Sequence, residues 1–428
     1  MKYSFCQIPI TVDIVGQEGF NRLGRDSTKP GEGIFMQVED FEKSPVGDLV
    51  PISGHDAYLK RDYEHFAFMP APLPKDVRLS MGAHQLADKA SMSVGRLDFA
   101  VKRLPDPGLL VRPALRREAQ STSALEGTYT TLEEVLEADY FDAANRRAEV
   151  REVLNYVRAA EQALELIQKK PICLNVIAPL QATLVNGTRG DSWDKGRLRE
   201  SNVYIGERSQ GIEASRFVPP PHRDLLVQGV SDWEKWIHAD DDYPLLVKIA
   251  MAHYQFETLH PFSDGNGRLG RLIVTLQLVT EGALTYPLLN LSPWLEPRKD
   301  EYKDLLLGIS KTGDFDPWIR FFCEGVHHQA EDAVARIEEL LTFQSQLRRK
   351  LVEAKARGVV NAVAESLLGY PIITIPEVAR LHHVTYPPAK NAITTLVELG
   401  ALREMSTVFD YGAKGFRCDP VMEILNRA

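Results

Sequence analysis

Apolar residues recur at three- and four-residue intervals along most of the chain, a spacing that predicts a mainly helical protein. Residues 109–127, LLVRPALRREAQSTSALEG, have this spacing and end at Gly127, a residue type that often terminates helices. A further helix is expected to begin at Thr131, because Thr131 and Glu134 have the spacing of a capping box. Two more helices are expected between residues 144 and 188.

The helical pattern resumes in residues 244–262 and 271–282, and again in a long amphipathic stretch at about residues 327–356. The apolar positions of that stretch have near-heptad spacing: Val334, Ile337, Leu341, Leu347 and Leu351. Residues 196–221 interrupt the helices; they are partly alternating, rich in turn residues and closed by three prolines, so we expect a β-hairpin there. Residues 1–65 contain short β-like pieces such as GIFMQVED, and no role can be assigned to them.

The C-terminal residues have a different pattern. Residues 375–405 predict a helix-turn-helix, and the β-like segment TVFDYGAKGFRC, residues 407–418, predicts a wing behind it. Winged helices often place their second helix in the major groove of DNA. From Lys355 onward basic residues barely exceed acidic ones, so phosphate affinity from this surface would be weak. DNA binding therefore stays open beside a protein-contact or structural role.

Composition narrows the classes of function. The formal net charge is -9 and the pI is about 5.7, which argues against a protein that coats nucleic acid by bulk electrostatics. The four cysteines form no CxxC pair, so we expect reduced thiols in a cytoplasmic protein rather than disulfides or a zinc site. There is no signal-peptide pattern and no run of about 18 apolar residues, so we expect neither secretion nor a membrane partner.

One stretch, HPFSDGNGRLGR at residues 260–271, places two cations and three glycines where a buried helix is expected to begin. Arg268 and Arg271 lie three residues apart and share one face of its first turn. Cations belong at the opposite end of a helix, so the arrangement breaks a local electrostatic rule. A bound polyanion would resolve the conflict, because Gly265 and Gly267 let the backbone approach phosphate oxygens at the helix N-terminus.

The same stretch holds residues for proton and metal chemistry. A histidine such as His260 can take a proton from an attacking hydroxyl. Asp264 beside phosphates suits Mg²⁺, and Asn266 can adopt the turn or offer its amide. GNGRLG also matches the GxGxxG pattern of dinucleotide-binding folds, but that interpretation requires a preceding strand, and a helix is expected here. The set indicates a nucleotide, a metal and a hydroxyl nucleophile.

HPFSDGNGRLGR resembles the HPFxDGNGRxxR signature of the Fic/Doc family and matches it at every fixed position. In that family the motif joins two helices of an all-α core that transfers AMP from ATP to a protein hydroxyl. The resemblance implies a mainly α protein, with an all-helical core, a β-hairpin flap and the C-terminal winged helix-turn-helix domain. It also implies that His260 is the general base and that Asp264 binds Mg²⁺.

The resemblance further assigns the phosphate-binding residues. Asn266 and the backbone of Gly265 and Gly267 would hold the phosphates nearest the transferred AMP. Arg268 and Arg271 would take the outer phosphates and the pyrophosphate leaving group. The implied ligands are ATP as substrate and Mg²⁺ as cofactor.

A second short motif lies upstream of the first. Glu126, in STSALEGT at residues 121–128, ends a predicted helix where its charge opposes the helix dipole. On its own it is typical of an exposed helix-end glutamate. The residues from Thr122 to Gly127 nevertheless resemble the Fic inhibitory motif, Ser/Thr-x-x-x-Glu-Gly/Asn. The resemblance implies that Glu126 pairs with Arg271 and blocks productive placement of the γ-phosphate.

Two other segments resemble parts of the family. Residues 197–206, RLRESNVYIG, resemble the flap, a hairpin that pins a target segment by adding it as a strand. The expected tip of this flap comprises Val203, Tyr204 and Ile205. Residues 291–306, LSPWLEPRKDEYKDLL, resemble the adenine-side segment. Trp294 and Tyr302 are its expected adenine neighbours, and an ordinary core role for both stays open.

The resemblance divides the chain into five parts. They are an extension of unknown role (1–65), a Fic N-terminal region with the inhibitory helix (66–150), the catalytic core (151–326), a linker helix (327–356) and the winged helix-turn-helix domain (357–428).

The implied activity is that of a protein adenylyltransferase. It would move AMP from MgATP to a Ser, Thr or Tyr hydroxyl of a target protein, including itself, under inhibition by Glu126. Removal of AMP by the same site, and a DNA-binding regulator with a nucleotide-sensing core, are the alternatives. The expected partner is a target protein with an exposed hydroxyl residue, and a homodimer and DNA are further candidates.

Overall fold

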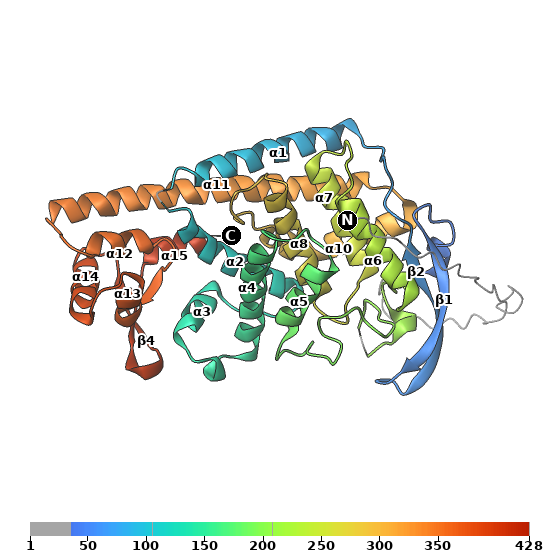
Figure 1. Ribbon diagram of the computed structural model, residues 1–428, viewed down its shortest axis with the longest axis horizontal. Coiled ribbons are helices and arrows are strands. Elements are labelled where there is room, and N and C mark those ends of the chain that lie inside the picture. Colours follow the sequence, from blue (N-terminus) through green and yellow to red (C-terminus); the bar gives the residue numbers. More distant parts are fainter. Residues whose placement is uncertain (1–35, 105, 208, 428) are drawn as a thin grey trace, which may run out of the picture. The chain divides into compact units, whose positions relative to one another are not determined.

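The computed structural model describes residues 36–104, 106–207 and 209–427, and this part of the chain is mainly helical, as the sequence predicts (Figure 1). The helices of the core are α1 (Met81–Val101), α2 (Gly108–Leu125), α3 (Leu132–Glu137), α4 (Ala148–Leu166), α5 (Leu174–Val185), α6 (Asp224–Ile237), α7 (Leu245–Leu259), α8 (Asn266–Thr280), α9 (Ser292–Leu295), α10 (Lys299–Thr312) and α11 (Asp316–Glu353). The C-terminal helices are α12 (Val360–Ser366), α13 (Ile375–Leu381), α14 (Tyr386–Glu398) and α15 (Asp419–Asn426). The strands are β1 (Gly47–Asp56), β2 (Arg61–Pro70), β3 (Ile372–Thr374), β4 (Arg403–Val408) and β5 (Lys414–Arg417).

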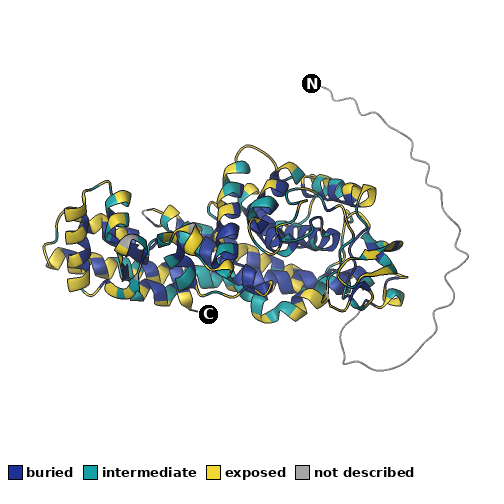
Figure 2. Ribbon diagram, turned by 90° about the horizontal axis from the view of Figure 1, so that it is seen from below, coloured by how far each residue is buried: buried dark blue, intermediate teal, exposed yellow. Residues whose placement is uncertain are grey.

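Helix α7 is at the centre of the packing. It is apolar on nearly all sides, so it is buried rather than amphipathic. Ile249 and Tyr254 join the apolar cluster that includes α1 and α11, whereas Ala252 and Phe256 join the cluster of α4, α5 and α8. The buried residues, dark blue in Figure 2, line the inner faces of these helices. Helix α7 therefore fixes the residue that follows it, His260, between two parts of the core.

Helix starts agree with the sequence in one case and differ in another. The capping box at Thr131 and Glu134 is confirmed at the start of α3. Helix α11, however, begins at Asp316 and not near residue 327, because the buried apolar positions continue upstream through residues such as Phe322. The predicted division between residues 326 and 327 therefore falls inside one continuous helix, along which α1 packs (Figure 1).

A two-stranded antiparallel sheet, β1 and β2, precedes the helices. The predicted boundary at residue 65 falls inside β2. Of the β-like piece GIFMQVED, residues 33–35 lie outside the described residues, and Val38–Asp40 form a 3-10 turn instead of a strand. The sheet packs on the segment before α6, since the Phe68 N–H donates to the Val218 carbonyl at 2.9 Å.

The hairpin predicted for residues 196–221 is wrong as a regular hairpin. The described residues of this segment contain a single antiparallel bridge, between Ile205 and Phe217, in which the Ile205 N–H donates to the Phe217 carbonyl at 2.8 Å. The prolines at 219–221 have no N–H to continue a ladder, so pairing stops there. The flap is a loop held by one bridge.

The C-terminal elements run along the chain in the order α12, β3, α13, α14, β4 and β5, and the strands form an antiparallel sheet in the order β3-β5-β4. The winged helix-turn-helix stays a prediction. Several side chains join this part to the core, and those of Arg112 and Tyr140 are two of them. Arg112 of α2 donates through Nη1 to the Gly369 carbonyl at 2.7 Å, and its guanidinium lies 4.2 Å from the ring centroid of Tyr370. The Tyr140 hydroxyl donates to the Ile372 carbonyl at 2.6 Å. DNA binding by this part stays a prediction.

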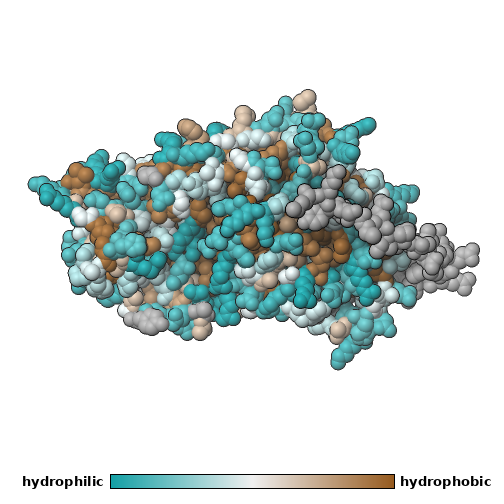
Figure 3. All heavy atoms as spheres, viewed as in Figure 1, coloured by the Kyte–Doolittle hydropathy of each residue, from teal (hydrophilic) through white to brown (hydrophobic). Residues whose placement is uncertain are grey.

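Two features of the described residues concern membrane contact, namely the apolar content of the helices and the hydropathy of the surface face shown in Figure 3. Among the described residues, no helix combines the length and the apolar content needed to cross a membrane. The face in Figure 3 carries hydrophilic and neutral residues between small apolar patches.

The α1–α11 contact makes a stability prediction. Leu97 of α1 is fully buried, whereas Met92 of the same helix is 64% exposed. We expect Leu97→Ala to lower the free energy of unfolding by about 2–5 kcal/mol, because a buried cavity replaces the side chain. Met92→Ala should change it by less than about 0.5 kcal/mol. Urea denaturation followed by circular dichroism measures both, and equal losses would contradict the packing described.

Candidate active site

The stretch singled out by the sequence forms the loop between α7 and α8. His260 follows α7 with φ of 48°, a left-handed conformation that non-glycine residues seldom adopt, and its N–H donates to the Phe256 carbonyl at 3.0 Å. Gly265 has φ of 83° and leads directly into α8. The chain reverses at these two residues, and His260 and Gly267 line one cavity.

Asn266 braces this loop. It is buried; its Oδ1 accepts the Phe262 N–H at 2.9 Å, and its Nδ2 donates to the Phe262 carbonyl at 2.7 Å. The side-chain amide, which the sequence assigned to phosphates, is therefore engaged within the loop. Backbone N–H groups of the first turn of α8 have no intrahelical acceptor and are the groups available to an anion.

The cavity at this junction has a volume of about 170 Å³, and residues from α7, α8, α10, the end of α2 and the flap line it. Of the predicted site residues, those that line it are Glu126, Ile205, His260, Gly267, Arg271 and Tyr302. Val203, Tyr204 and Trp294 are not among its lining residues. One cavity thus brings together residues of the 260–271 motif, Glu126 of the upstream motif, and Ile205 of the predicted flap tip.

Glu126 and Arg271 form an ion pair in this cavity. Arg271 Nη2 lies 2.6 Å from Glu126 Oε1, and Arg271 also donates through Nε to Thr122 Oγ1 at 2.6 Å and through Nη2 to the Thr122 carbonyl at 3.1 Å. A Cβ at Gly267 would collide with the Glu126 carboxylate and lie 3.0 Å from Arg271 Nη1. Only glycine at residue 267 therefore permits this approach.

Both members of the pair are charged. Burial opposes ionisation of Glu126, but the Arg271 guanidinium outweighs it and lowers the pKa of the carboxyl. Burial likewise opposes the charge of Arg271, and Glu126 nevertheless raises the pKa of the guanidinium. The Glu126 side chain is 38% exposed, whereas the Arg271 side chain is 2% exposed.

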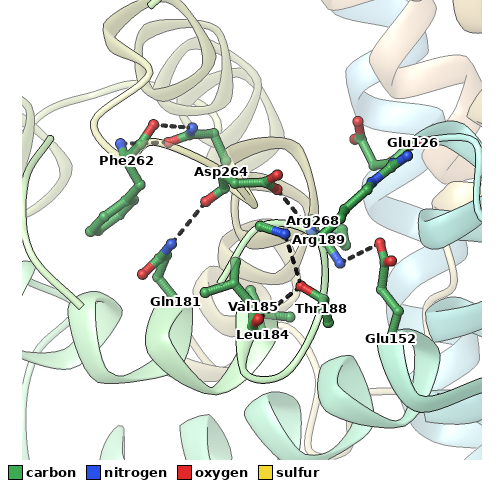
Figure 4. A network of polar contacts seen from close by, with 12 residues as sticks. Glu126, Glu152, Gln181, Leu184, Val185, Thr188, Arg189, Phe262, Asp264 and Arg268 are labelled. Atoms are coloured by element: carbon green, nitrogen blue, oxygen red, sulfur yellow. Dashed lines mark hydrogen bonds and ion pairs between the residues drawn. The ribbon is translucent and has the colours of Figure 1, made fainter. Parts of the chain in front are cut away.

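Arg268 faces away from this pair, toward α4. Its Nη1 lies 2.7 Å from Glu152 Oε1 and its Nη2 lies 3.0 Å from Asp264 Oδ1, so it bridges two carboxylates (Figure 4). Sequence reasoning missed Glu152, because a single glutamate in an amphipathic helix carries no sign of its partner.

His260 is suited to accept a proton. Burial, and to a smaller degree the Arg199 guanidinium, lower the pKa of its imidazole to about 4. The imidazole is therefore neutral near pH 7. Its Nδ1 lies 3.4 Å from the Glu257 carbonyl, which favours a proton on Nδ1 and leaves Nε2 as the acceptor.

Arg199 is a second residue that sequence reasoning missed. It is 1% exposed, and burial lowers the pKa of its guanidinium to about 10. It donates through Nε to the His260 carbonyl at 2.9 Å and through Nη1 to the Ser201 carbonyl at 3.1 Å, and through Nη2 to the Pro220 carbonyl. Arg199 thus ties the loop of His260 to both sides of the flap. Nothing in RLRESNVYIG indicates that its arginine is buried.

The two residues predicted to lie beside adenine, Tyr302 and Trp294, lie in different places. Tyr302 lines the cavity, and its hydroxyl lies 2.7 Å from His253 Nε2. Trp294 stacks on His328, with ring centroids 4.9 Å apart, and the Arg298 guanidinium lies 3.6 Å from the Trp294 ring centroid. Trp294 therefore belongs to a surface stack outside the cavity.

The predicted Mg²⁺ site rests on one carboxylate. Within the described residues, no group of three or more His, Cys, Asp or Glu side chains is placed to hold a metal ion. Mg²⁺ often uses one or two carboxylates together with substrate phosphates, so Asp264 alone fits that chemistry. A Cβ at Gly190 would collide with the Asp264 carboxyl, so the backbone at Gly190 supports it.

Arg189 connects the loop after α5 to the inhibitory motif. Its Nη2 donates to the Glu126 carbonyl at 2.8 Å, at the end of α2, where a cation complements the helix dipole. Gln181 of α5 donates to the Asp264 carbonyl at 2.9 Å (Figure 4). Helix α5 and the loop after it thus hold the backbones of both motifs, and Arg189 is a third residue that the sequence did not reveal.

Comparison with known proteins agrees with this geometry. Residues 84–165 match the sequence model described as Fic/DOC family N-terminal, and residues 171–278 match the one described as Fic/DOC family. A protein adenylyltransferase Fic of Drosophila virilis is 29% identical over 209 residues, which are 48% of this chain and 38% of that protein. Another of the same name from Culex quinquefasciatus is 31% identical over 136 residues, 31% of this chain and 24% of that protein.

The chain therefore spans less than half the length of these curated relatives. A crystal structure of a Fic family protein from Desulfovibrio desulfuricans covers 81% of this chain and 98% of its own, with a TM-score of 0.53 and 20% identity. That likeness shows a shared fold.

The depressed pKa of His260 can be measured directly. We expect its imidazole signal in a histidine-labelled NMR titration to have a midpoint near pH 4. The unfolded chain binds this proton first, at about pH 6.5, so His260 contributes less to stability as the pH falls from 6.5 to 4. His260→Ala assigns the signal. A midpoint near 6.5 would show that the imidazole is not desolvated as described.

Proposed function

Because this chain carries both domains of the Fic/DOC family, we propose that it is a protein adenylyltransferase that moves AMP from ATP to a Ser, Thr or Tyr hydroxyl of a protein, itself included. The relatives named protein adenylyltransferase Fic support this activity at the level of the family. The observation that carries the proposal is the neutral imidazole of His260 in one cavity with the first turn of α8.

In the proposed reaction the target hydroxyl loses its proton to Nε2 of His260. Its oxygen bonds to the α-phosphorus while the bond from that phosphorus to the bridging oxygen breaks, and pyrophosphate leaves with the electron pair. The N–H groups at the start of α8 and the Arg268 guanidinium stabilise charge on the phosphates. Asp264 would hold Mg²⁺, which neutralises phosphate charge when bound.

The flap would hold the target. Ile205 forms the bridge to Phe217 and also lines the cavity of His260. A peptide added along residues 197–206 would therefore run beside the imidazole. Such backbone pairing places few demands on target side chains, so position selects the modified hydroxyl.

The Glu126–Arg271 pair would restrain the reaction. Arg271 cannot offer Nη2 to a phosphate while it is bound to Glu126 at 2.6 Å. With the pair formed, the cavity of about 170 Å³ is smaller than the roughly 300–1,000 Å³ typical of ligand pockets. Glu126 lies at the end of α2, before Gly127 with φ of 84°, so it can leave without unfolding the helix.

Label transfer from ATP radioactive at the α-phosphate tests the proposal. We expect Glu126→Gly to raise protein labelling about tenfold or more, because it frees Arg271. Adding His260→Ala to that variant should abolish labelling, because no base remains to take the hydroxyl proton. Omission of Mg²⁺ should also suppress it. ATP radioactive at the γ-phosphate is the control, since it should transfer no label.

Two outcomes would contradict this proposal. Labelling that persists after His260→Ala would exclude His260 as the base. No labelling in any variant that binds ATP would exclude AMP transfer.

The same cavity supports removal of AMP as a second candidate. The ionised Glu126 carboxylate lines the cavity together with His260, so it can orient a water toward a phosphodiester. Loss of label from a pre-labelled protein would then require Glu126, whereas transfer would not.

Arg189 gives an independent test of the restraint. We expect Arg189→Ala to raise labelling about two- to tenfold, less than Glu126→Gly, because one hydrogen bond to the Glu126 carbonyl is lost. Arg103→Ala removes an exposed arginine just beyond α1 and should leave labelling unchanged. Combining Arg189→Ala with Glu126→Gly should add nothing, and an additive gain would show that Arg189 acts elsewhere.

A further inference from the structure

Two carboxylates from the region matched as Fic/DOC family N-terminal hold the two motif arginines. Glu126 of α2 holds Arg271, and Glu152 of α4 holds Arg268 at 2.7 Å. The first carboxylate is 38% exposed and the second is 8% exposed. The two pairs therefore differ in how readily they can separate.

Glu152 is fixed by its helix. It lies within α4, whose neighbouring residue Asn155 is buried and donates to the carbonyls of Leu184 at 3.2 Å and Asn186 at 2.8 Å. Helix α4 also packs on α2, α5 and α8. Glu152 cannot leave Arg268 without displacing this helix, whereas Glu126 is at a helix end.

The buried guanidinium of Arg268 is held by two carboxylates, those of Glu152 and Asp264. Its Nη2 contacts Asp264, and its Nε is buried without a hydrogen-bond partner among the described residues. In the proposed reaction Asp264 would hold Mg²⁺, and Glu152 would then be the carboxylate that orients Arg268. With Nη1 of Arg268 held by Glu152, its Nη2, which contacts Asp264 at 3.0 Å, would be the nitrogen available to a phosphate.

We propose that Glu152 is a positioning residue that aims the Arg268 guanidinium at the leaving pyrophosphate. This inference rests on the proposed function. Charge on the leaving group develops as the bond breaks, so misorientation of Arg268 affects the chemical step more than nucleotide binding.

Kinetics in the Glu126→Gly background test this role. Adding Glu152→Gln keeps the shape and removes the charge, and we expect kcat to fall about tenfold or more while the Kd for MgATP changes less than about threefold. Glu152→Asp should recover part of the loss. Glu165→Gln, at an exposed residue of α4, is the matched control and should retain activity. Unchanged or increased kcat in Glu152→Gln would overturn the proposal.

A double-substitution cycle tests whether Glu152 acts through Arg268. In a variant with Arg268→Lys, Glu152→Gln should cause little further loss, because the planar donor that it aims is already gone. Fully additive losses would overturn the proposal.

An NMR measurement tests the positioning role of Glu152 without relying on AMP transfer. We expect the Arg268 Nε–H signal in ¹⁵N NMR spectra to be sharp with Glu152 present and broadened in Glu152→Gln, with Arg268→Lys assigning it. Glu152→Asp serves if Glu152→Gln does not fold. An unchanged signal would refute the positioning role. Absence of label transfer in all variants, with the expected NMR change, would instead refute the proposed function alone.

Discussion

Two guanidinium groups lie buried at the positive end of one helix, α8. The elements packed around α8 must therefore supply negative charge to them. Arg268 and Arg271 are each 3% exposed, in a place where the helix dipole disfavours cations. Buried charges require partners, and here the partners are carboxylates on α2 and α4. The N-terminal region of the family match is therefore part of the electrostatics of the site, not a separate cover.

The same constraint explains the small residues around the motif. Glycine at 267 lets the Glu126 carboxylate reach Arg271, and glycine at 190 lets the chain rest on Asp264. On the opposite side, Arg199 donates to the His260 carbonyl, and burial together with this guanidinium lowers the pKa of His260. Buried cations thus lie on both sides of the site: Arg268 and Arg271 at the start of α8, and Arg199 beside His260.

The sequence predicted what local patterns encode. The mainly helical fold and the capping box at Thr131 follow from spacing within a few residues, and the motif itself marks where α8 begins. Arg199, Arg189 and Glu152 were not predictable, because their partners lie far along the chain and nothing local reveals burial. The sequence predicted a regular hairpin for the flap, but the described residues of that segment contain one bridge. Alternating residues favour pairing, whereas prolines lack the N–H groups that a ladder needs. The amide of Asn266 was assigned outward because the sequence cannot show that it closes on Phe262.

Because Glu126 and a phosphate would compete for the same nitrogen of Arg271, nucleotide binding and restraint are linked by mass action. If ATP is the substrate, as proposed, its apparent affinity would be the intrinsic affinity multiplied by the fraction of molecules in which Glu126 has left Arg271. Each tenfold rise in nucleotide concentration offsets about 1.4 kcal/mol of the ion pair. In the proposed reaction the Glu126–Arg271 contact would therefore set a threshold concentration of nucleotide.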